Sequence, residues 1–336
     1  MLLKPDIADE LILDCLKTNF ALQIKQLDFL PLGGDLSTAV YQATANDDSV
    51  YFCKLRLADY DPISTGLPKY LHDQGVSAVV PPLVTIDGKL AADMDTAKLI
   101  LYPYIEGVEG YTLELSEEQW FSFGKALQGL HTLEIPESFL ASVEKESYTP
   151  EWRERCKQLL RRLENETFED SISLEMLSLL ASKQELMLHA LDRADQLAIL
   201  MAQRSLPFVL CHSDIHPGNL HITPKGKLYI VDWDYPMLAP KERDLMFIGG
   251  GQGFMPFDAE HEEKLFYKGY GSADRDPMAL AYYRYERGIT EITVEAERVL
   301  SPSLNDQDRA RALTYIGYYF LPGATLERAI AVDQGW

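Results

Sequence analysis

Three oxygen-bearing side chains, Asp214, Asn219 and Asp232, stand at the ends of a predicted hairpin. Residues 220–231 have two short apolar runs separated by a turn-forming segment, a pattern typical of two antiparallel strands. Because a hairpin returns the chain to its start, we expect Asn219 and Asp232 to lie side by side. Carboxylate and amide oxygens so placed suit Mg²⁺ when phosphates and water complete its coordination.

Asp214 lies five residues before Asn219, and the spacing His212-x-Asp214-x-x-x-x-Asn219 is that of a kinase catalytic loop. A carboxylate there can orient a substrate hydroxyl and accept its proton. Asp, Asn, Pro and Gly are also common in turns that do no chemistry. The spacing, the hairpin and the following Asp232-Trp233-Asp234 together favour the catalytic interpretation.

Lys54 is a second candidate, in the otherwise largely apolar run 50–57. Burying an ammonium group is costly without an anionic partner, and in kinases the α- and β-phosphates of ATP provide one. The alternative is a lysine on the solvent face of an edge strand. Beside the motif around Asp214, we favour the functional interpretation.

A glycine-rich bend precedes this strand and contains Gly33, Gly34, Ser37 and Thr38. Glycine lets backbone N–H groups approach phosphates, and the two hydroxyls can donate hydrogen bonds. The bend matches neither a Walker sequence nor the glycine-rich loop of protein kinases. A simple hairpin turn is the alternative.

The remaining pattern predicts an α+β protein with two lobes. We expect a helix at 6–20, a helix at 63–75 that Pro68 interrupts, and mainly helices after residue 116, where Ser116 and Gln119 form a capping-box pattern. Strands are predicted at 27–32, 39–44, 50–57, 79–86 and 99–105, and 208–235 is again β-like. We predict a nucleotide-binding lobe at 1–102, a hinge at 103–107 and a catalytic and acceptor-binding lobe at 108–336.

Residues 212–219 and 230–234 resemble the signature of aminoglycoside phosphotransferases and of related choline and homoserine kinases. The stretches 71–73, 209–216, 236–251 and 282–287 are most similar to the branch that phosphorylates spectinomycin. The likeness extends from about residue 27 to residue 291. It implies a bilobal protein-kinase-like fold and ATP- and Mg²⁺-dependent phosphorylation of a hydroxyl on a small cationic molecule, most simply an aminocyclitol. The sequence does not distinguish ATP from GTP.

The resemblance also implies site residues. Asp214 would be the catalytic base, and Asn219 and Asp232 the metal ligands. Asp234 would be a second metal ligand, or it would orient the residues that bind the metal directly. His212 and His216 would brace the catalytic loop.

In such a fold the hinge meets the adenine, and by position we expect the carbonyl of Tyr102 and the N–H of Tyr104 to bind it, since Pro103 has no N–H. One departure concerns Lys54. Kinases usually pair the strand lysine with a glutamate on the next helix, but residues 61–73 contain none, and Asp61 would be a poor substitute. The departure raises the alternative of a nucleotide-binding module with impaired catalysis.

Acceptor contacts are predicted on a C-terminal helix with Tyr283, Tyr285, Glu286 and Glu291, whose carboxylates would pair with ammonium groups. The alternative is a solvated helix face with Glu–Arg pairs. A net charge of −21 suits a cationic ligand and argues against nucleic acid and anionic membranes as partners. A metabolic kinase acting on choline or homoserine is the main alternative function.

The four cysteines are widely spaced and form no Cys-x-x-Cys pair, so we expect buried thiols in a reducing compartment. Neither a membrane-spanning run nor a signal-peptide pattern is evident, and we therefore expect a cytoplasmic protein. The sequence does not determine the oligomeric state.

Overall fold

The computed structural model describes residues 4–32, 37–57, 60–95, 97–249, 258–271 and 274–335. The chain forms two compact units: unit 1 comprises 1–113, 134–143 and 217–236, and unit 2 comprises 114–133, 144–216 and 237–336. The predicted hinge at residues 103–107 stays a prediction. Residues 217–236 belong to unit 1 although they follow this hinge in the sequence.

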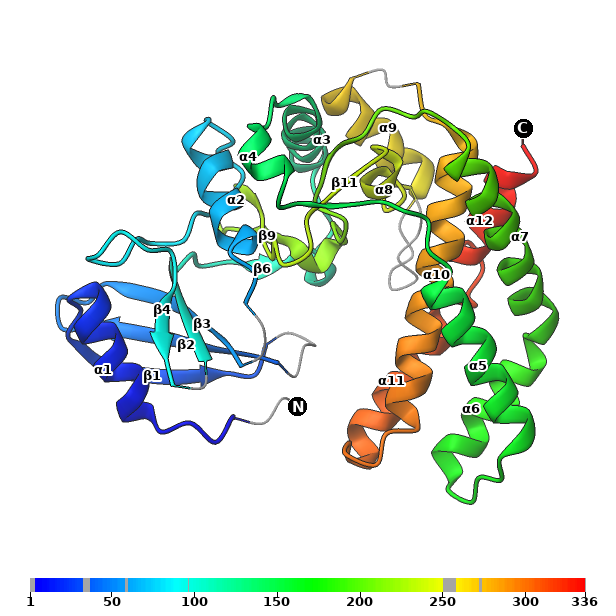
Figure 1. Ribbon diagram of the computed structural model, residues 1–336, viewed down its shortest axis with the longest axis horizontal. Coiled ribbons are helices and arrows are strands. Elements are labelled where there is room, and N and C mark those ends of the chain that lie inside the picture. Colours follow the sequence, from blue (N-terminus) through cyan, green and yellow to red (C-terminus); the bar gives the residue numbers. More distant parts are fainter. Residues whose placement is uncertain are drawn as a thin grey trace. The chain divides into compact units, whose positions relative to one another are not determined.

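Unit 1 is built on a five-stranded antiparallel sheet with the strand order β1-β2-β3-β5-β4. Helix α1 packs against this sheet through Ile12 and Leu16, both fully buried (Figure 1). The predicted helix at 6–20 and the predicted strands at 27–32, 39–44, 50–57 and 99–105 are each found within a few residues of their expected ends. The elements are α1 Asp9–Phe20, β1 Ile24–Leu30, β2 Thr38–Ala45, β3 Val50–Arg56, β4 Ala92–Met94 and β5 Ala97–Pro103.

The strand predicted at 79–86 is wrong. In the described structure this segment is irregular except for a single bridge between Val79 and Ile230. Pro81 and Pro82 interrupt the apolar run and have no N–H to donate to a neighbouring strand. The segment is nevertheless tied to the sheet, because the Leu83 N–H donates to the Leu101 carbonyl at 2.7 Å.

The prediction that Pro68 interrupts its helix is also wrong: α2 runs from Ile63 to Asp73 with Pro68 inside it. Leu67 and Leu71 of this helix are fully buried, so tertiary packing outweighs the hydrogen bond that proline removes. Asp61 lies two residues before the start of the helix, and its carboxylate accepts a hydrogen bond from the Ile63 N–H at 3.0 Å.

A second, three-stranded sheet in unit 1 has the order β10-β9-β6. Strands β9 (Leu220–Ile222) and β10 (Leu228–Ile230) form the predicted hairpin and pair antiparallel, with His221 opposite Tyr229. Strand β6 (Val108–Glu109) and the short 3₁₀ helices η1 (Gly110–Thr112) and η2 (Pro217–Asn219) complete this part. Helix α4 (Glu137–Leu140) also belongs to unit 1.

Unit 2 is mainly helical, and its longest helix, α10 (Pro277–Val299), packs against α5, α7, α11 and α12 (Figure 1). Helix α3 (Glu117–Thr132) begins with the predicted capping box, in which Ser116 and Gln119 each bond the other's backbone N–H. A small sheet of order β7-β11-β8 lies in the same unit. The remaining elements are β7 Glu144–Lys145, α5 Glu151–Asn165, α6 Ser171–Ser182, α7 Gln184–Ala202, β8 Val209–Cys211, β11 Met237–Ala239, α8 Glu242–Leu245, α9 Ala259–Tyr270, α11 Asp306–Tyr318 and α12 Thr325–Asp333.

The architecture is therefore α+β, as predicted, with a β-rich N-terminal part and a larger helical C-terminal part. All four cysteines are free and buried, which confirms the expectation of buried thiols. Within the part of the chain that the structure describes, no helix combines the length and apolar character that crossing a membrane requires.

Candidate active site

The loop that follows β8 in unit 2 carries His212, Ser213 and Asp214 in a strained conformation. Ser213 has φ +73°, a left-handed backbone that a side-chain-bearing residue rarely adopts. His212 is 1% exposed, and its Nδ1 accepts a hydrogen bond from the Asp214 N–H at 3.3 Å. Strained backbone persists where surrounding contacts enforce it, and it is common at functional sites.

Asp244 supplies the contacts that enforce this turn. Its fully buried carboxylate accepts hydrogen bonds from two successive backbone N–H groups, that of His212 at 2.9 Å and that of Ser213 at 2.7 Å. Burial alone would raise the pKa of Asp244, but hydrogen bonding and the positive potential of nearby His131 lower it below its ordinary value. Asp244 therefore acts as an anionic anchor for the loop.

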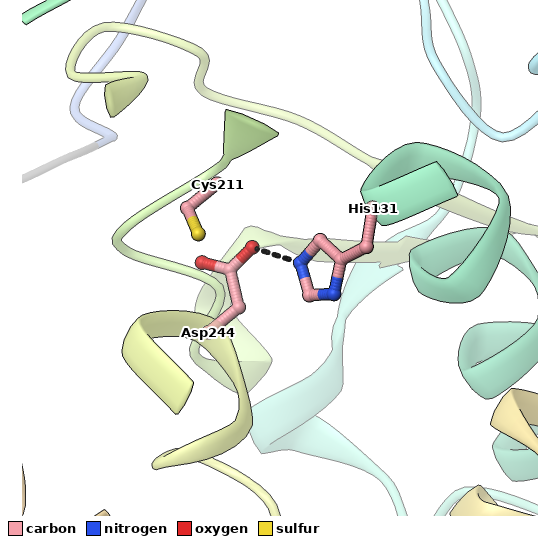
Figure 2. A group of neighbouring side chains, drawn as sticks. All are labelled: His131, Cys211 and Asp244. Atoms are coloured by element: carbon pink, nitrogen blue, oxygen red, sulfur yellow. Dashed lines mark hydrogen bonds and ion pairs between the residues drawn. The ribbon is translucent and has the colours of Figure 1, made fainter. Parts of the chain in front are cut away.

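His131 holds this anchor from helix α3 (Figure 2). Its Nε2 lies 3.0 Å from Asp244 Oδ2, and its Nδ1 is hydrogen-bonded to the Tyr270 hydroxyl of α9 at 2.7 Å. The two helices approach closely because Gly124 has no side chain: a Cβ there would lie 2.1 Å from the Phe266 carbonyl oxygen. Helix packing thus reaches the loop through three hydrogen-bonded side chains.

Cys211 lies beside this pair, and the ligand atoms of His131, Cys211 and Asp244 are within 4.8 Å of one another (Figure 2). The donor types are those of a transition-metal site. However, both ring nitrogens of His131 and both oxygens of Asp244 are already in hydrogen bonds, and burial raises the pKa of the Cys211 thiol. The group is a hydrogen-bonded support for the loop.

Asp214 itself is about a third exposed and lies against two basic side chains of unit 2. Arg287 Nη1 donates to Asp214 Oδ1 at 2.8 Å, and His216 Nε2 lies 3.6 Å from Oδ2. Burial would raise the pKa of Asp214, but the Arg287 guanidinium, with His216 and His212, holds it well below the ordinary value. The carboxylate is therefore ionised throughout the physiological range.

Unit 1 gathers a separate cluster around Lys54 on strand β3. The Lys54 ammonium donates to Asp232 at 2.9 Å and to both oxygens of Asp234 at 2.8 Å. Arg56, on the same face of β3, donates to Asp234 at 2.9 Å. Burial would lower the pKa of Lys54, but the two carboxylates raise it, so the ammonium stays charged. The Asp61 carboxylate accepts a hydrogen bond from the Ile63 N–H, and the anionic partners of this lysine are Asp232 and Asp234.

Asn219 and Asp232 lie at the same end of the β9–β10 hairpin, because the Val231 N–H donates to the Asn219 carbonyl at 3.0 Å. Asp232 has a left-handed backbone with φ +65°, and its side chain is about half exposed. An amide oxygen and an exposed carboxylate on neighbouring strand ends fit the oxygen preference of Mg²⁺. The residues present are therefore compatible with the metal that the motif implies.

The structure describes only some of the residues that are predicted to bind the nucleotide. Gly33 and Gly34 lie outside the described residues. So do Gly250 and Gly251, the last two residues of the stretch 236–251. Thr38 accepts a hydrogen bond from Arg56 at 2.9 Å, and the Ser37 carbonyl accepts one from the Leu57 N–H at 2.8 Å.

Of the two hinge tyrosines, Tyr102 lies near the end of strand β5 and Tyr104 follows it. Tyr102 lies opposite Phe52 in the β3–β5 pair. The Tyr104 N–H donates to the Val50 carbonyl at 3.3 Å, so binding adenine through this N–H would require that bond to break.

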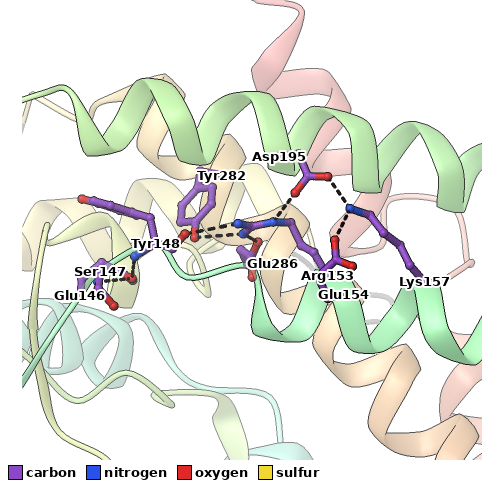
Figure 3. A network of polar contacts seen from close by, with 9 residues as sticks. All are labelled: Glu146, Ser147, Tyr148, Arg153, Glu154, Lys157, Asp195, Tyr282 and Glu286. Carbon is purple, nitrogen blue, oxygen red and sulfur yellow. Dashed lines mark hydrogen bonds and ion pairs between the residues drawn. The ribbon is translucent and has the colours of Figure 1, made fainter.

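Three of the four predicted acceptor residues on α10 are buried, and Figure 3 shows one of them, Glu286, among its polar neighbours. Glu286, 9% exposed, forms an ion pair with Arg153, which also donates to Asp195 at 2.7 Å. Tyr283 is fully buried, which leaves no exposed surface for an acceptor. Tyr285 is also fully buried, and its hydroxyl donates to Asp333 at 3.2 Å.

The second acidic candidate, Glu291, is partly exposed, forms an ion pair with Arg287 at 3.0 Å and accepts a hydrogen bond from the Tyr319 hydroxyl at 3.2 Å. The Glu–Arg pairs considered as the alternative from the sequence are thus present on this helix. Acceptor binding by Glu286 or Glu291 remains a prediction, and either carboxylate would have to share or exchange its arginine.

Sequence reasoning missed Asp244, His131 and Arg287. Asp244 and Arg287 contact the loop around residues 212–214 from at least 30 positions away in the chain, and His131 reaches it only through Asp244. No local spacing connects an isolated aspartate, histidine or arginine with a distant loop, so only an alignment of related chains could have indicated them.

Together the fold and these charged groups define a phosphotransferase. The protein belongs to the phosphotransferase enzyme family, whose model matches residues 28–280. Among solved structures, spectinomycin phosphotransferase APH(9)-Ia in complex with ADP and spectinomycin is 35% identical with a TM-score of 0.90, over 98% of this chain and 100% of that chain. Its AMP complex gives 32% identity and a TM-score of 0.86 over the same shares.

The choline kinase LicA from Streptococcus pneumoniae has the same fold at 16% identity, with a TM-score of 0.57 over 93% of this chain and 99% of that chain. Among curated protein sequences none matches this chain. The predicted family and the predicted type of enzyme are confirmed.

Proposed function

We propose that the protein transfers the γ-phosphoryl group of ATP to a hydroxyl of a small cationic aminocyclitol, with spectinomycin or a close relative as acceptor. The observation that carries this proposal is the 35% identity, over 98% of the chain, to a phosphotransferase solved with ADP and spectinomycin. The net charge of −21 supports a cationic acceptor. ATP supply and four free buried thiols fit the cytoplasm as the site of action.

The proposed roles in unit 1 follow from the charges there. Lys54 binds the α- and β-phosphates, exchanging part of its contact with Asp232 for them. Asn219 and Asp232 hold Mg²⁺, which when bound neutralises phosphate charge. Ser37 and Thr38 lie beside β3 and are proposed to assist in phosphate binding, together with Gly33 and Gly34.

Asp234 is proposed to replace the missing helix glutamate as the partner of Lys54. It contacts the ammonium with both oxygens at 2.8 Å, which supports a positioning role more than direct metal binding. The doubt about catalytic competence rested on Lys54 having no anionic partner. These contacts supply such a partner and support a competent enzyme over an impaired module.

Asp214 is the proposed catalytic base, braced by His212. A carboxylate with a lowered pKa is a weak base, so it would not remove the hydroxyl proton before phosphoryl transfer begins. In the loose transition state of phosphoryl transfer little proton removal is needed early, and orienting the hydroxyl matters more. We therefore propose that Asp214 orients the acceptor hydroxyl first and takes its proton late.

Steady-state kinetics with ATP and Mg²⁺ test the function. The acceptors are spectinomycin, choline, homoserine and a neutral cyclitol, with mass spectrometry to detect the added phosphate. We expect the highest kcat/KM with spectinomycin. A higher value with choline or homoserine would replace the aminocyclitol proposal by a metabolic kinase. The fold that this chain shares with a choline kinase is compatible with that alternative.

A further inference from the structure

Arg287 is the side chain of α10 that contacts the proposed base directly. One guanidinium nitrogen, Nη1, donates to Asp214 Oδ1 at 2.8 Å, and the other, Nη2, lies 3.0 Å from Glu291 Oε1. The guanidinium carbon lies 5.2 Å from the centroid of the Phe247 ring. The group is therefore held by two carboxylates and an aromatic face, all within unit 2.

This clamp extends beyond the arginine. Glu291 lies one helical turn further along α10, and its other oxygen accepts a hydrogen bond from the Tyr319 hydroxyl at 3.2 Å. A planar guanidinium with two engaged nitrogens has little freedom to rotate. The chain Tyr319, Glu291, Arg287 thus presents a fixed donor to Asp214 Oδ1.

The contact with Arg287 makes the two carboxylate oxygens of Asp214 inequivalent. With Oδ1 engaged by Arg287, the carboxylate plane is set, and Oδ2 is the oxygen that faces His216 at 3.6 Å. A proton acceptor in phosphoryl transfer must hold the attacking hydroxyl in line with the leaving group. A carboxylate free to rotate would hold that geometry only part of the time.

We propose that Arg287 is a positioning residue for the phosphoryl-transfer reaction, which clamps Asp214 Oδ1 so that Oδ2 receives the acceptor hydroxyl. The inference rests on the proposed function of Asp214. It assigns Glu291 the task of holding Arg287, in addition to or in place of a contact with the acceptor.

The test measures kcat and KM for spectinomycin with Arg287→Met, Arg287→Lys and Asp214→Ala, each in the full chain. We expect Arg287→Met to lower kcat about 10²-fold, the scale of a misplaced catalytic group, with KM changed by less than about threefold. Arg287→Lys should recover part of the loss because it restores a donor. Arg155→Met is the matched control. It removes an exposed arginine of α5 that is paired with Glu297 of α10, and it should leave kcat unchanged.

A double mutant separates positioning from general structural support. Asp214→Ala should lower kcat by about 10²–10⁴-fold. If Arg287 acts through Asp214, adding Arg287→Met to that variant should cause little further loss, whereas independent effects would multiply. Multiplying losses, unchanged kcat in Arg287→Met, or a loss confined to KM would each overturn the inference.

A readout that needs no acceptor keeps this test separate from the proposed function. The ionisation of Asp214, followed by carbon NMR of its carboxyl group, should move to higher pH in Arg287→Met and stay in place in Arg155→Met. If the wild-type protein phosphorylates no acceptor, the proposed function fails. An unchanged Asp214 titration in Arg287→Met would refute the clamp, whichever acceptor is used.

Discussion

At the scale of single residues, the candidate chemistry depends on charges that are each held by an opposite charge. Asp214 is paired with Arg287, and Lys54 with Asp232 and Asp234. Burial of a charged group without a partner would shift the pKa of that group in the direction that favours its neutral form. These pairs keep the carboxylate and the ammonium ionised and hold them in place.

The proposed metal ligands can be distinguished from the lysine partner by mutation. Asn219→Ala and Asp232→Ala should raise the Mg²⁺ concentration for half-maximal activity about tenfold or more, because each removes a proposed oxygen ligand. Asp234→Asn should leave that concentration nearly unchanged and instead raise the KM for ATP about tenfold, the cost of one charge-assisted hydrogen bond to Lys54. Titrations of activity with Mg²⁺ and with ATP give both values.

Asp93→Asn is the control for lost charge, since Asp93 lies in an exposed pair with Lys98 in the same unit. It should change neither value. If Asp234→Asn shifted the Mg²⁺ titration as strongly as Asn219→Ala, Asp234 would be a metal ligand after all.

At the scale of elements, short connections and close helix packing fix the positions of these residues. The β9–β10 hairpin holds Asn219 and Asp232 at one end through a backbone hydrogen bond. The packing of α3 on α9 brings Tyr270 to His131, and His131 in turn contacts Asp244, which bonds the backbone of the loop. Backbone strain at Ser213 is thereby maintained by elements distant in sequence.

Two glycines of α3 provide a matched pair for testing this packing. In Gly124→Ala the added Cβ would lie 2.1 Å from the Phe266 carbonyl oxygen and 2.7 Å from the Tyr270 nitrogen, so α9 must move. We expect a loss of unfolding free energy of about 1–3 kcal/mol, with reduced kcat. Gly129→Ala has nothing within 4 Å and should stabilise the helix by about 0.5–1 kcal/mol. Urea unfolding measures both, and equal effects would contradict the close approach.

Glu295 of α10 predicts a pH dependence of stability. Burial raises its pKa to about 7 from an ordinary 4.5, so the folded state binds a proton that the unfolded state releases. Stability should therefore fall as pH rises from about 4.5 to about 7, by up to about 3 kcal/mol. Glu295→Gln removes this charge and should be more stabilising at pH 8 than at pH 5.

The measurement is urea unfolding at the two pH values. Glu297→Gln, at a more exposed position of the same helix, should stay within about 0.5 kcal/mol of the wild type at both. An advantage of Glu295→Gln that did not grow with pH would rule out a buried proton at this position.

At the scale of the whole molecule, a net charge of −21 gives the protein a negative potential that attracts cations and repels anionic polymers. The five-stranded sheet and the helices around α10 have their own buried cores, in unit 1 and unit 2 respectively. Each core supports a different part of the proposed reaction: Lys54 and the metal ligands in unit 1, Asp214 and its clamp in unit 2.

Attraction of a cationic acceptor should depend on salt. Raising NaCl from about 0.02 M to about 0.3 M shortens the screening length severalfold and should lower kcat/KM for spectinomycin several times. The value for a neutral cyclitol should stay constant and serves as the control. A salt-independent kcat/KM for spectinomycin would show that the overall charge does not assist binding.

Much of the local structure could be predicted from the sequence because its causes are local. Alternating apolar residues and a turn predict the β9–β10 hairpin, and Ser116 with Gln119 predicts the start of α3. The spacing from His212 to Asn219 predicts a catalytic loop, and this prediction was possible because the motif lies within eight consecutive residues. Both errors of element prediction involved proline, at Pro68 and at residues 81–82.

Only the tertiary structure decided which charges meet. Lys54 and Asp234 are 180 positions apart in the chain, and Asp214 and Arg287 are 73 apart. Such pairings depend on how strands and helices pack, and no residue spacing encodes them. For the same reason the missing helix glutamate looked like a defect in the sequence, whereas the fold brings Asp234 to Lys54 from the far end of a hairpin.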